Sequence, residues 1–178
     1  MLQMTRNELL SILPKELIWA ELGVFEGEFS KKIFELAKPK ELHLIDIFPS
    51  SMISGDKDGK NIKTLDLTNI PNVLAEYFKN KNVFIHKCTT VEFLENAKKI
   101  SMPIDAVYID ADHSYNAVML DLDKSYDILP KNGYICGHDY NEKIFPEVFQ
   151  AVNDFCTKNS LNIQVKTDDL LPSFLIKL

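Results

Sequence analysis

The sequence predicts an α/β fold: a three-layer α/β/α sandwich around a mostly parallel seven-stranded sheet with an antiparallel C-terminal edge. Short apolar runs alternate with segments of helical periodicity along most of the chain, which is typical of repeated strand–helix–strand units. The last two strand-like segments alternate apolar and polar residues and follow one another directly, as an antiparallel pair does. The 178 residues suffice for one core but not for two, so we expect a single domain over residues 1–178.

The first half of the chain contains three of the predicted strands. Residues 1–13 form an amphipathic helical pattern that Pro14 ends. The apolar run 17–22 breaks at Gly23, as a buried strand would. The next helix, strand, loop, helix and strand are expected at residues 29–37, 41–48, 49–61, 73–78 and 82–86. The segment 49–61 is predicted as a loop because it is polar and contains glycines.

The second half of the chain repeats the alternation and then ends in two strands. Apolar residues at helical spacing predict helices at residues 91–99, 116–129 and 148–155. Strands are expected at residues 104–109, 134–136, 162–166 and 173–177, the second of them after an Asn-Gly turn. Helices that connect parallel strands cover both faces of the sheet, which gives the three layers.

Charge and composition exclude several classes of partner. The formal net charge is −6, and the scattered lysines form no basic stripe between aromatic residues, so we expect no nucleic-acid partner. No apolar run is long enough to span a membrane and no signal-peptide pattern is present, which favours a cytoplasmic protein. Cys88, Cys136 and Cys156 are widely spaced and odd in number, as expected for reduced thiols or small buried hydrophobic residues.

The residues after each predicted strand form the candidate site, because open parallel sheets bind ligands at the carboxyl ends of their strands. Glu21 lies near the end of the first strand, and Gly23 and Gly27 follow it, where they permit a tight turn and a close approach to a ligand. Ser30 lies at the start of the next helix. The glycine spacing matches neither a dinucleotide fingerprint nor a Walker loop. A turn that binds no ligand is the alternative.

The second and third strands end in one acid and two threonines. Asp46 lies within an apolar strand about twenty residues after the glycines, a distance at which a carboxylate can accept both hydroxyls of a ribose. The alternatives for Asp46 are a helix cap or a surface salt bridge. Thr89 and Thr90 follow the third strand, where each would either cap the next helix or border an adenine in a nucleoside site.

The fourth and fifth strands end in the densest group of ionisable residues. Asp110, Asp112 and His113 follow a strand that must be buried, and a purely structural loop rarely gathers so many groups that are costly to desolvate. His138 and Asp139 follow the next strand. Because adjacent parallel strands end close together, Asp110, His138 and Asp139 could converge on one divalent cation.

These motifs resemble those of class I S-adenosylmethionine-dependent methyltransferases, which have a Rossmann-like sheet, over almost the whole chain from Trp19 onward. Residues 21–30, 108–115 and 129–140 are similar to the cofactor loop and two later motifs of a small O-methyltransferase group. That group includes macrocin-type sugar methyltransferases and cephalosporin-hydroxylase-like proteins. The resemblance implies that S-adenosylmethionine is the cofactor. Its implied ligands are Glu21, Gly23, Gly27 and Ser30 in the cofactor loop around the methionine moiety, Asp46 at the ribose and Asp110 beside the methyl group.

Catechol-type relatives place a metal-binding aspartate after the fourth strand and a basic catalytic residue three positions later. Here these positions are Asp110 and His113. His113 is the candidate general base, since the pKa of an imidazole is close to neutrality. Those relatives complete the metal site with two residues after the next strand, where this chain has His138 and Asp139. Histidine suits manganese, iron or zinc better than magnesium, so we expect either a divalent metal or orientation of a substrate hydroxyl by His138.

The sequence thus favours an S-adenosylmethionine-dependent methyltransferase that acts on a hydroxyl of a small molecule or sugar, with Asp110 and His113 as catalytic residues. The chain has little room for a substrate lid, so residues 49–61 or a second subunit of a homodimer are expected to cover the acceptor. One alternative is a nicotinamide-linked oxidoreductase, against which the glycine spacing argues. The others are a non-catalytic protein that binds S-adenosylmethionine or a nucleoside, and a metal-dependent hydrolase that uses Asp110, His138 and Asp139.

Overall fold

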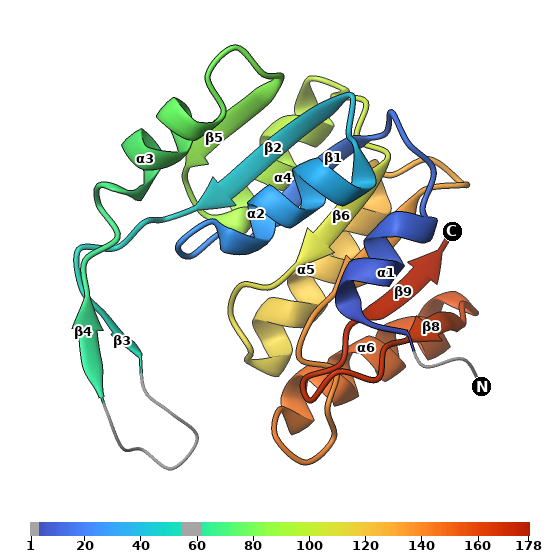
Figure 1. The fold of residues 1–178 in the computed structure, drawn as a ribbon. Helices are drawn as coiled ribbons and strands as arrows, with labels where there is room; N and C mark the ends of the chain where they lie inside the picture. The colour runs from blue at the N-terminus through green and yellow to red at the C-terminus, as the bar shows by residue number, and fades with distance from the viewer. Residues whose placement is uncertain (1–3, 55–61) are drawn as a thin grey trace.

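The computed structural model describes residues 4–54 and 62–178. Its centre is a seven-stranded sheet with the strand order β5-β2-β1-β6-β7-β9-β8 (Figure 1). The strands are β1 (Ile18–Leu22), β2 (Glu41–Asp46), β5 (Val83–Lys87), β6 (Ala106–Ile109), β7 (Tyr134–Gly137), β8 (Ile163–Lys166) and β9 (Phe174–Lys177). The first five pair in parallel, whereas β9 is antiparallel to both β7 and β8. The predicted sheet and its antiparallel C-terminal edge are confirmed.

Helices cover both faces of this sheet (Figure 1). They are α1 (Arg6–Ile12), α2 (Glu28–Lys32), which continues as a π-helix at Ile33–Ala37, α3 (Ile70–Tyr77), α4 (Thr90–Lys99), α5 (Tyr115–Ile128) and α6 (Pro146–Asn159). One hydrophobic cluster joins α4, α5 and α6 to the sheet, and a second joins α1, α3 and the π-helix. Side chains of β1 alternate between the two, with Ala20 in the first and Trp19 in the second. The sheet is therefore the middle layer of a Rossmann-like α/β/α sandwich.

The first helix begins later than the sequence pattern predicts. Thr5 accepts a hydrogen bond from the backbone N–H of Glu8, and the Glu8 carboxylate accepts one from the N–H of Thr5, so the two form a capping box. This cap starts α1 at Arg6, and residues 1–3 of the predicted helix lie outside the described residues. The cap places Arg6 in the first turn of α1.

In the part of the chain that the structure describes, no helix combines the length and hydropathy needed to cross a membrane.

The segment predicted as a loop, residues 49–61, is partly a strand. β3 (Met52–Ser54) pairs with β4 (Lys63–Leu65) in an antiparallel two-stranded ribbon that points away from the main sheet (Figure 1). The loop prediction is wrong for Met52–Ser54, because a three-residue strand is too short to show an alternating pattern and its partner comes later in the sequence. The rest of the predicted loop, residues 55–61, lies outside the described residues.

Candidate active site

The carboxyl ends of β1, β2 and β6 lie side by side, since Leu22 is in register with Ile45 of β2 and with Ile109 of β6. The segments after these strands and after β5 line one cavity of about 460 Å³. Its walls are formed by Gly23, Phe25, Ile45, Asp46, Ile47, Pro49, Ser51, Met52, Cys88, Thr89, Thr90, Asp110, Ala111 and Asp112. The structure thus brings together the predicted site residues Gly23, Asp46, Thr89, Thr90 and Asp110.

Gly23 lets the loop after β1 approach the end of β6. Its φ of +90° lies in the left-handed region, and a Cβ atom there would collide with the carbonyl group of Asp110 and lie 2.8 Å from the Cα of Ala111. The close approach of two backbones therefore requires this glycine, whatever the cavity binds. Gly27 also has a positive φ, of +79°, but a Cβ there would meet Leu74 of α3, and Gly27 does not line the cavity.

Glu21 and Ser30 form a buried pair behind the loop after β1. The Ser30 hydroxyl donates a hydrogen bond of 2.5 Å to Oε2 of Glu21, and neither residue is among those that line the cavity. Burial raises the pKa of Glu21 to about 8, although the hydrogen bond from Ser30 acts in the opposite direction. The Glu21 carboxyl group is therefore mostly protonated at neutral pH. A cation that came close to it would favour release of this proton.

Asp46 ends β2 and holds the loops on both sides of the cavity. Its Oδ2 accepts hydrogen bonds from the backbone N–H groups of Val24 (2.9 Å) and Phe25 (3.0 Å), and its Oδ1 accepts one from Phe48 (2.7 Å). Asp46 is thus neither a helix cap nor part of a salt bridge among the described residues. The carboxylate lines the cavity while its hydrogen bonds fix its orientation.

Thr89 and Thr90 line the cavity and have structural partners as well. Thr89 is the N-cap of α4 and forms a capping box with Glu92. The Thr90 hydroxyl donates a hydrogen bond of 2.6 Å to Oδ1 of Asp121, a buried residue of α5. Burial raises the pKa of Asp121 to about 6, against the effect of this hydrogen bond. The capping role expected for one threonine is confirmed for Thr89.

Beside the cavity, Asp139 lies between two histidines. Nε2 of His113 is 2.9 Å from Oδ2 of Asp139, and Nδ1 of His138 is 3.2 Å from its Oδ1. Burial alone would raise the pKa of Asp139, but the hydrogen bond and charge of the two imidazoles hold it well below its ordinary value. The hydrogen bond to Asp139 in turn raises the pKa of His113, against the effect of burial. The N-cap of α5 is Ser114, so His113 does not cap this helix.

Three side chains of this group have the spacing of a metal site. Asp110, His113 and Asp139 each offer one ligand atom, and these atoms lie within 4.8 Å of one another. Oδ1 of Asp139 is buried and its contact with Nδ1 of His138, at 3.2 Å, is not aligned as a hydrogen bond, so among the described residues this oxygen keeps lone pairs that a cation could use. The mixed nitrogen and oxygen donors suit manganese, iron or zinc. His138, expected from the sequence as a ligand, is not a member of this set, and its Nδ1 lies 3.7 Å from Oδ2 of Asp110.

Arg6 is the site residue that the sequence analysis missed. Its Nη2 donates a hydrogen bond of 2.7 Å to Oδ2 of Asp110, and its Nε donates one of 2.6 Å to the hydroxyl of Tyr108. The guanidinium carbon lies 3.3 Å from the centroid of the Phe29 ring, which is a cation–π contact. The one feature of the sequence that singles it out is that Arg6 is the only arginine in the chain.

The cavity at the strand ends, with a histidine–aspartate pair beside it, lies at the edge where Rossmann-like sheets bind their ligands. A family model described as a methyltransferase domain matches residues 20–140. The chain therefore belongs to this methyltransferase family. It is also 29% identical over 139 residues to an uncharacterized protein of Acanthamoeba polyphaga mimivirus. That match covers 78% of this chain and 58% of the relative, so the chain spans little more than half of the relative's length.

Solved structures share the fold at low sequence identity. The Methanococcus jannaschii fibrillarin pre-rRNA processing protein has a TM-score of 0.64 and 13% identity, over 92% of this chain and 67% of that chain. The N-methyltransferase NodS from Bradyrhizobium japonicum has a TM-score of 0.64 and 13% identity, over 97% and 92%. Aeropyrum pernix fibrillarin in complex with natively bound S-adenosyl-L-methionine has a TM-score of 0.63 and 12% identity, over 96% and 72%. The fold is thus that of class I S-adenosylmethionine-dependent methyltransferases.

Proposed function

We propose that this protein transfers a methyl group from S-adenosylmethionine to a hydroxyl group of a small molecule or sugar. The observation that carries the proposal is the hydrogen bond between His113 and Asp139, because it provides a general base next to Asp110 and the cavity. Membership of the methyltransferase family supports the reaction type. The fibrillarin that holds S-adenosyl-L-methionine on the same fold supports the cofactor.

In the proposed complex the adenosine part of the cofactor occupies the cavity. Asp46 accepts hydrogen bonds from the ribose hydroxyls, and Thr89 and Thr90 border the adenine. The methionine part passes Gly23 toward Asp110, which places the methyl group near the end of β6. The cavity volume and its single carboxylate on the β2 side are consistent with a bound nucleoside.

His113 would act as the general base through its second ring nitrogen. Because Nε2–H donates to Asp139, the neutral imidazole carries its lone pair on Nδ1. Bound S-adenosylmethionine supplies an electrophilic methyl group, and Nδ1 would accept the proton of the attacking hydroxyl. Asp139 would stabilise the resulting imidazolium, as it already raises the pKa of His113. Positioning of the two substrates would supply much of the remaining acceleration.

A divalent cation held by Asp110, His113 and Asp139 is a second proposal for the same site, favoured by the spacing of their ligand atoms. Such an ion would lower the pKa of a bound hydroxyl and orient it. Arg6 already bonds to Oδ2 of Asp110, one of the two carboxylates in this set, and would compete with the ion for that oxygen. The two proposals differ in the effect of chelation, because the general-base mechanism is insensitive to EDTA whereas the metal mechanism loses activity.

The proposed acceptor is a small molecule, although the structural neighbours include a pre-rRNA processing protein and two proteins described as rRNA methylases. A net charge of −6 opposes the approach of a polyanion, which supports the small acceptor over RNA. We further propose that the β3–β4 ribbon or a second subunit covers the acceptor, and that the protein works in the cytoplasm. A methyl-transfer assay with hydroxylated small molecules and with structured RNA separates the two acceptor classes.

Calorimetric titration with S-adenosylhomocysteine, with and without divalent metal, tests the cofactor. We expect binding in the micromolar range and no binding of NAD. Binding of NAD instead would favour an oxidoreductase. Binding of S-adenosylhomocysteine without methyl transfer to any acceptor would favour a non-catalytic binding protein, and metal-dependent turnover without cofactor would favour a hydrolase.

A further inference from the structure

The only arginine of the chain is fixed in place at the end of β6. Arg6 bonds to Asp110 and Tyr108, and its guanidinium stacks on the Phe29 ring. About a fifth of its side chain is exposed. The helix that carries it is also tied down, because the N–H of Arg6 donates to Oδ2 of Asp169 at 2.6 Å. A charged group held so firmly beside a cavity is preorganised to bind an anion.

The strand ends are otherwise rich in carboxyl groups. Asp46, Asp110 and Asp112 line the cavity, while Glu21 and Asp139 are buried beside it. Among the residues that the structure describes, Arg6 is the one lysine or arginine that forms an ion pair with any of these acids. The ionised acids among them suit the positive charges of a bound ligand and repel a negative group, whereas Arg6 attracts one.

We propose that Arg6 binds the carboxylate of the methionine part of the cofactor, an inference that rests on the proposed function. The methionine part is an α-amino acid with an ammonium and a carboxylate on one carbon atom. The Arg6–Asp110 pair offers the complementary charges with its polar atoms 2.7 Å apart. The contact to Asp110 uses Nη2 and the contact to Tyr108 uses Nε, and no described residue bonds to Nη1, whose N–H groups are thus available to a carboxylate. The N-terminal helix would then be part of the cofactor site.

Two ligands that differ in the amino-acid part test this role. S-Adenosylhomocysteine carries the carboxylate, and 5′-methylthioadenosine has the same nucleoside and thioether without the amino acid. We expect Arg6→Gln to weaken S-adenosylhomocysteine binding about 10- to 100-fold and to change methylthioadenosine binding less than about twofold, both measured by calorimetry. Asn7→Ala, at the next position of the same helix, is the matched control and should leave both affinities unchanged.

If Arg6→Gln weakened the binding of both ligands equally, its role would be structural and the inference would be wrong. An unchanged affinity for S-adenosylhomocysteine would overturn the inference as well. Should Arg6→Gln not fold, as judged by circular dichroism and thermal melting, Arg6→Lys takes its place. Lysine keeps the positive charge but lacks the planar guanidinium, so we expect an intermediate loss of affinity for S-adenosylhomocysteine and none for methylthioadenosine. Affinities equal to those of wild type for both ligands would contradict the proposal. Failure of the wild-type protein to bind either ligand is a different result, since it contradicts the proposed function itself.

Decarboxylated S-adenosylhomocysteine extends the test to the wild-type chain. Wild type should bind it about 10- to 100-fold more weakly than the parent ligand, whereas Arg6→Gln should bind the two alike. If the losses of binding free energy from removing the arginine and from removing the carboxylate simply add, the two groups do not contact each other and the inference is wrong.

Discussion

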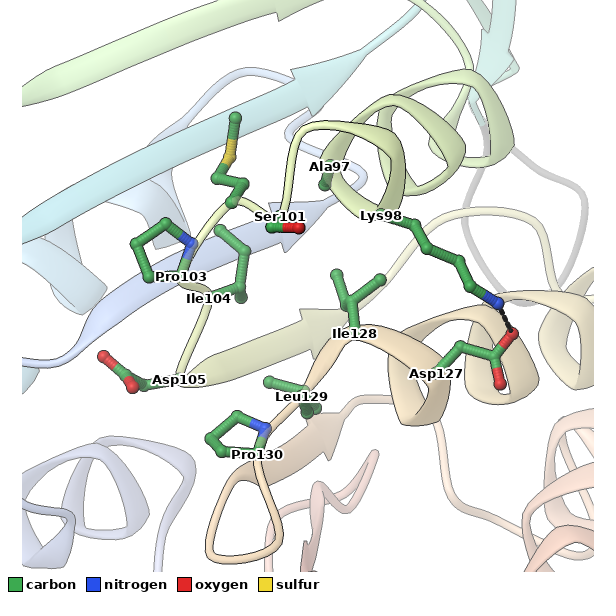
Figure 2. A pocket seen from close by; sticks show the side chains of 11 residues that line it. Ala97, Lys98, Ser101, Pro103, Ile104, Asp105, Asp127, Ile128, Leu129 and Pro130 are labelled. Atoms are coloured by element: carbon green, nitrogen blue, oxygen red, sulfur yellow. Dashed lines mark hydrogen bonds and ion pairs between the residues drawn. The ribbon is translucent and has the colours of Figure 1, made fainter.

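The two ends of β6 differ in what their aspartates bind. At the amino end, Oδ2 of Asp105 accepts a hydrogen bond of 2.9 Å from the backbone N–H of Ile18. At the carboxyl end, Asp110 bonds to Arg6 and faces His138. Each end borders a cavity, of about 390 Å³ at the amino end (Figure 2) and about 460 Å³ at the carboxyl end. Cavity size therefore does not distinguish the two ends, whereas the partners of their carboxylates do.

The two ends also differ in where their charges lie. At the amino end, Lys98 forms an ion pair with Asp127 (Figure 2). Its Nζ is 2.8 Å from Oδ2 of Asp127, and more than half of each side chain is exposed. At the carboxyl end Glu21, Asp121 and Asp139 are buried, where charged groups are costly to keep. Perturbed titrating groups of this kind gather at functional sites. Substitutions at the amino end should therefore affect stability alone, and those at the carboxyl end binding or turnover.

The largest effect is expected for His113→Gln. As the general base, His113 should contribute about 10²- to 10⁴-fold to turnover and little to cofactor affinity. The neutral imidazole is the active form and its pKa is raised, so the wild-type rate should increase with pH through a value above the ordinary 6.5 of histidine. Turnover of wild type and variant between pH 5 and 9 is the measurement. Near-normal turnover of the variant with the same pH profile would remove His113 from this role.

Glu21→Gln should stabilise the ligand-free protein at high pH. The folded state keeps the Glu21 proton up to about pH 8, whereas the unfolded state releases it above about 4.5. Wild-type stability therefore falls as the pH rises through this window, and glutamine removes the loss. Urea titration gives the free energy of unfolding of the variant minus that of wild type at each pH. We expect this difference to be about 2–4 kcal/mol larger at pH 8 than at pH 5. The exposed Glu26→Gln is the control, and an equal response there would contradict the burial argument.

Asp46→Ala should weaken binding of S-adenosylhomocysteine by about 1–3 kcal/mol. The variant loses the proposed ribose contact and leaves the N–H groups of Val24, Phe25 and Phe48 without their shared acceptor. Calorimetry measures the affinity, and thermal melting shows whether the loops still fold. An unchanged affinity would place Asp46 outside the cofactor site and leave it with a loop-closing role.

The strand ends could be predicted from the sequence because they depend on local patterns. Apolar runs define β1, β2 and β6, and the polar residues directly after them, such as Asp46 and Asp110, then follow at one edge of the sheet. Arg6 could not be predicted, since its contacts with Tyr108 and Asp110 join residues more than a hundred positions apart. The π-helix after α2 likewise has no local signal.

The pairing of His113 with Asp139 was also beyond the sequence, although both residues were predicted as site residues. With these residues at the same strand ends, several pairings among Asp110, His113, His138 and Asp139 are possible. Which histidine meets which carboxylate depends on side-chain orientation, which packing decides, as in the contact of the His113 ring with Phe145. Sequence patterns therefore locate a site more readily than they assign roles within it.

Asp105→Ala should lower the free energy of unfolding by about 1 kcal/mol and leave cofactor affinity unchanged. The variant removes one hydrogen bond, to the N–H of Ile18 at the start of β1, which water can partly replace. Compared with Asp46→Ala, it tests whether carboxylates at the two edges of the sheet have separate roles. A loss of affinity comparable to that of Asp46→Ala would show that they do not.

The smallest effect is expected for Lys98→Ala, beside the cavity at the amino end of β6 (Figure 2). Solvent screens the exposed ion pair of Lys98 with Asp127, so the variant should change the free energy of unfolding by less than about 0.5 kcal/mol. A double-mutant cycle with Asp127→Ala should give a coupling energy of similar size that decreases with salt. Cofactor affinity and turnover should stay within about twofold of wild type. A larger loss of either would show that the amino-end cavity takes part in function, and the contrast between the two ends of β6 would no longer hold.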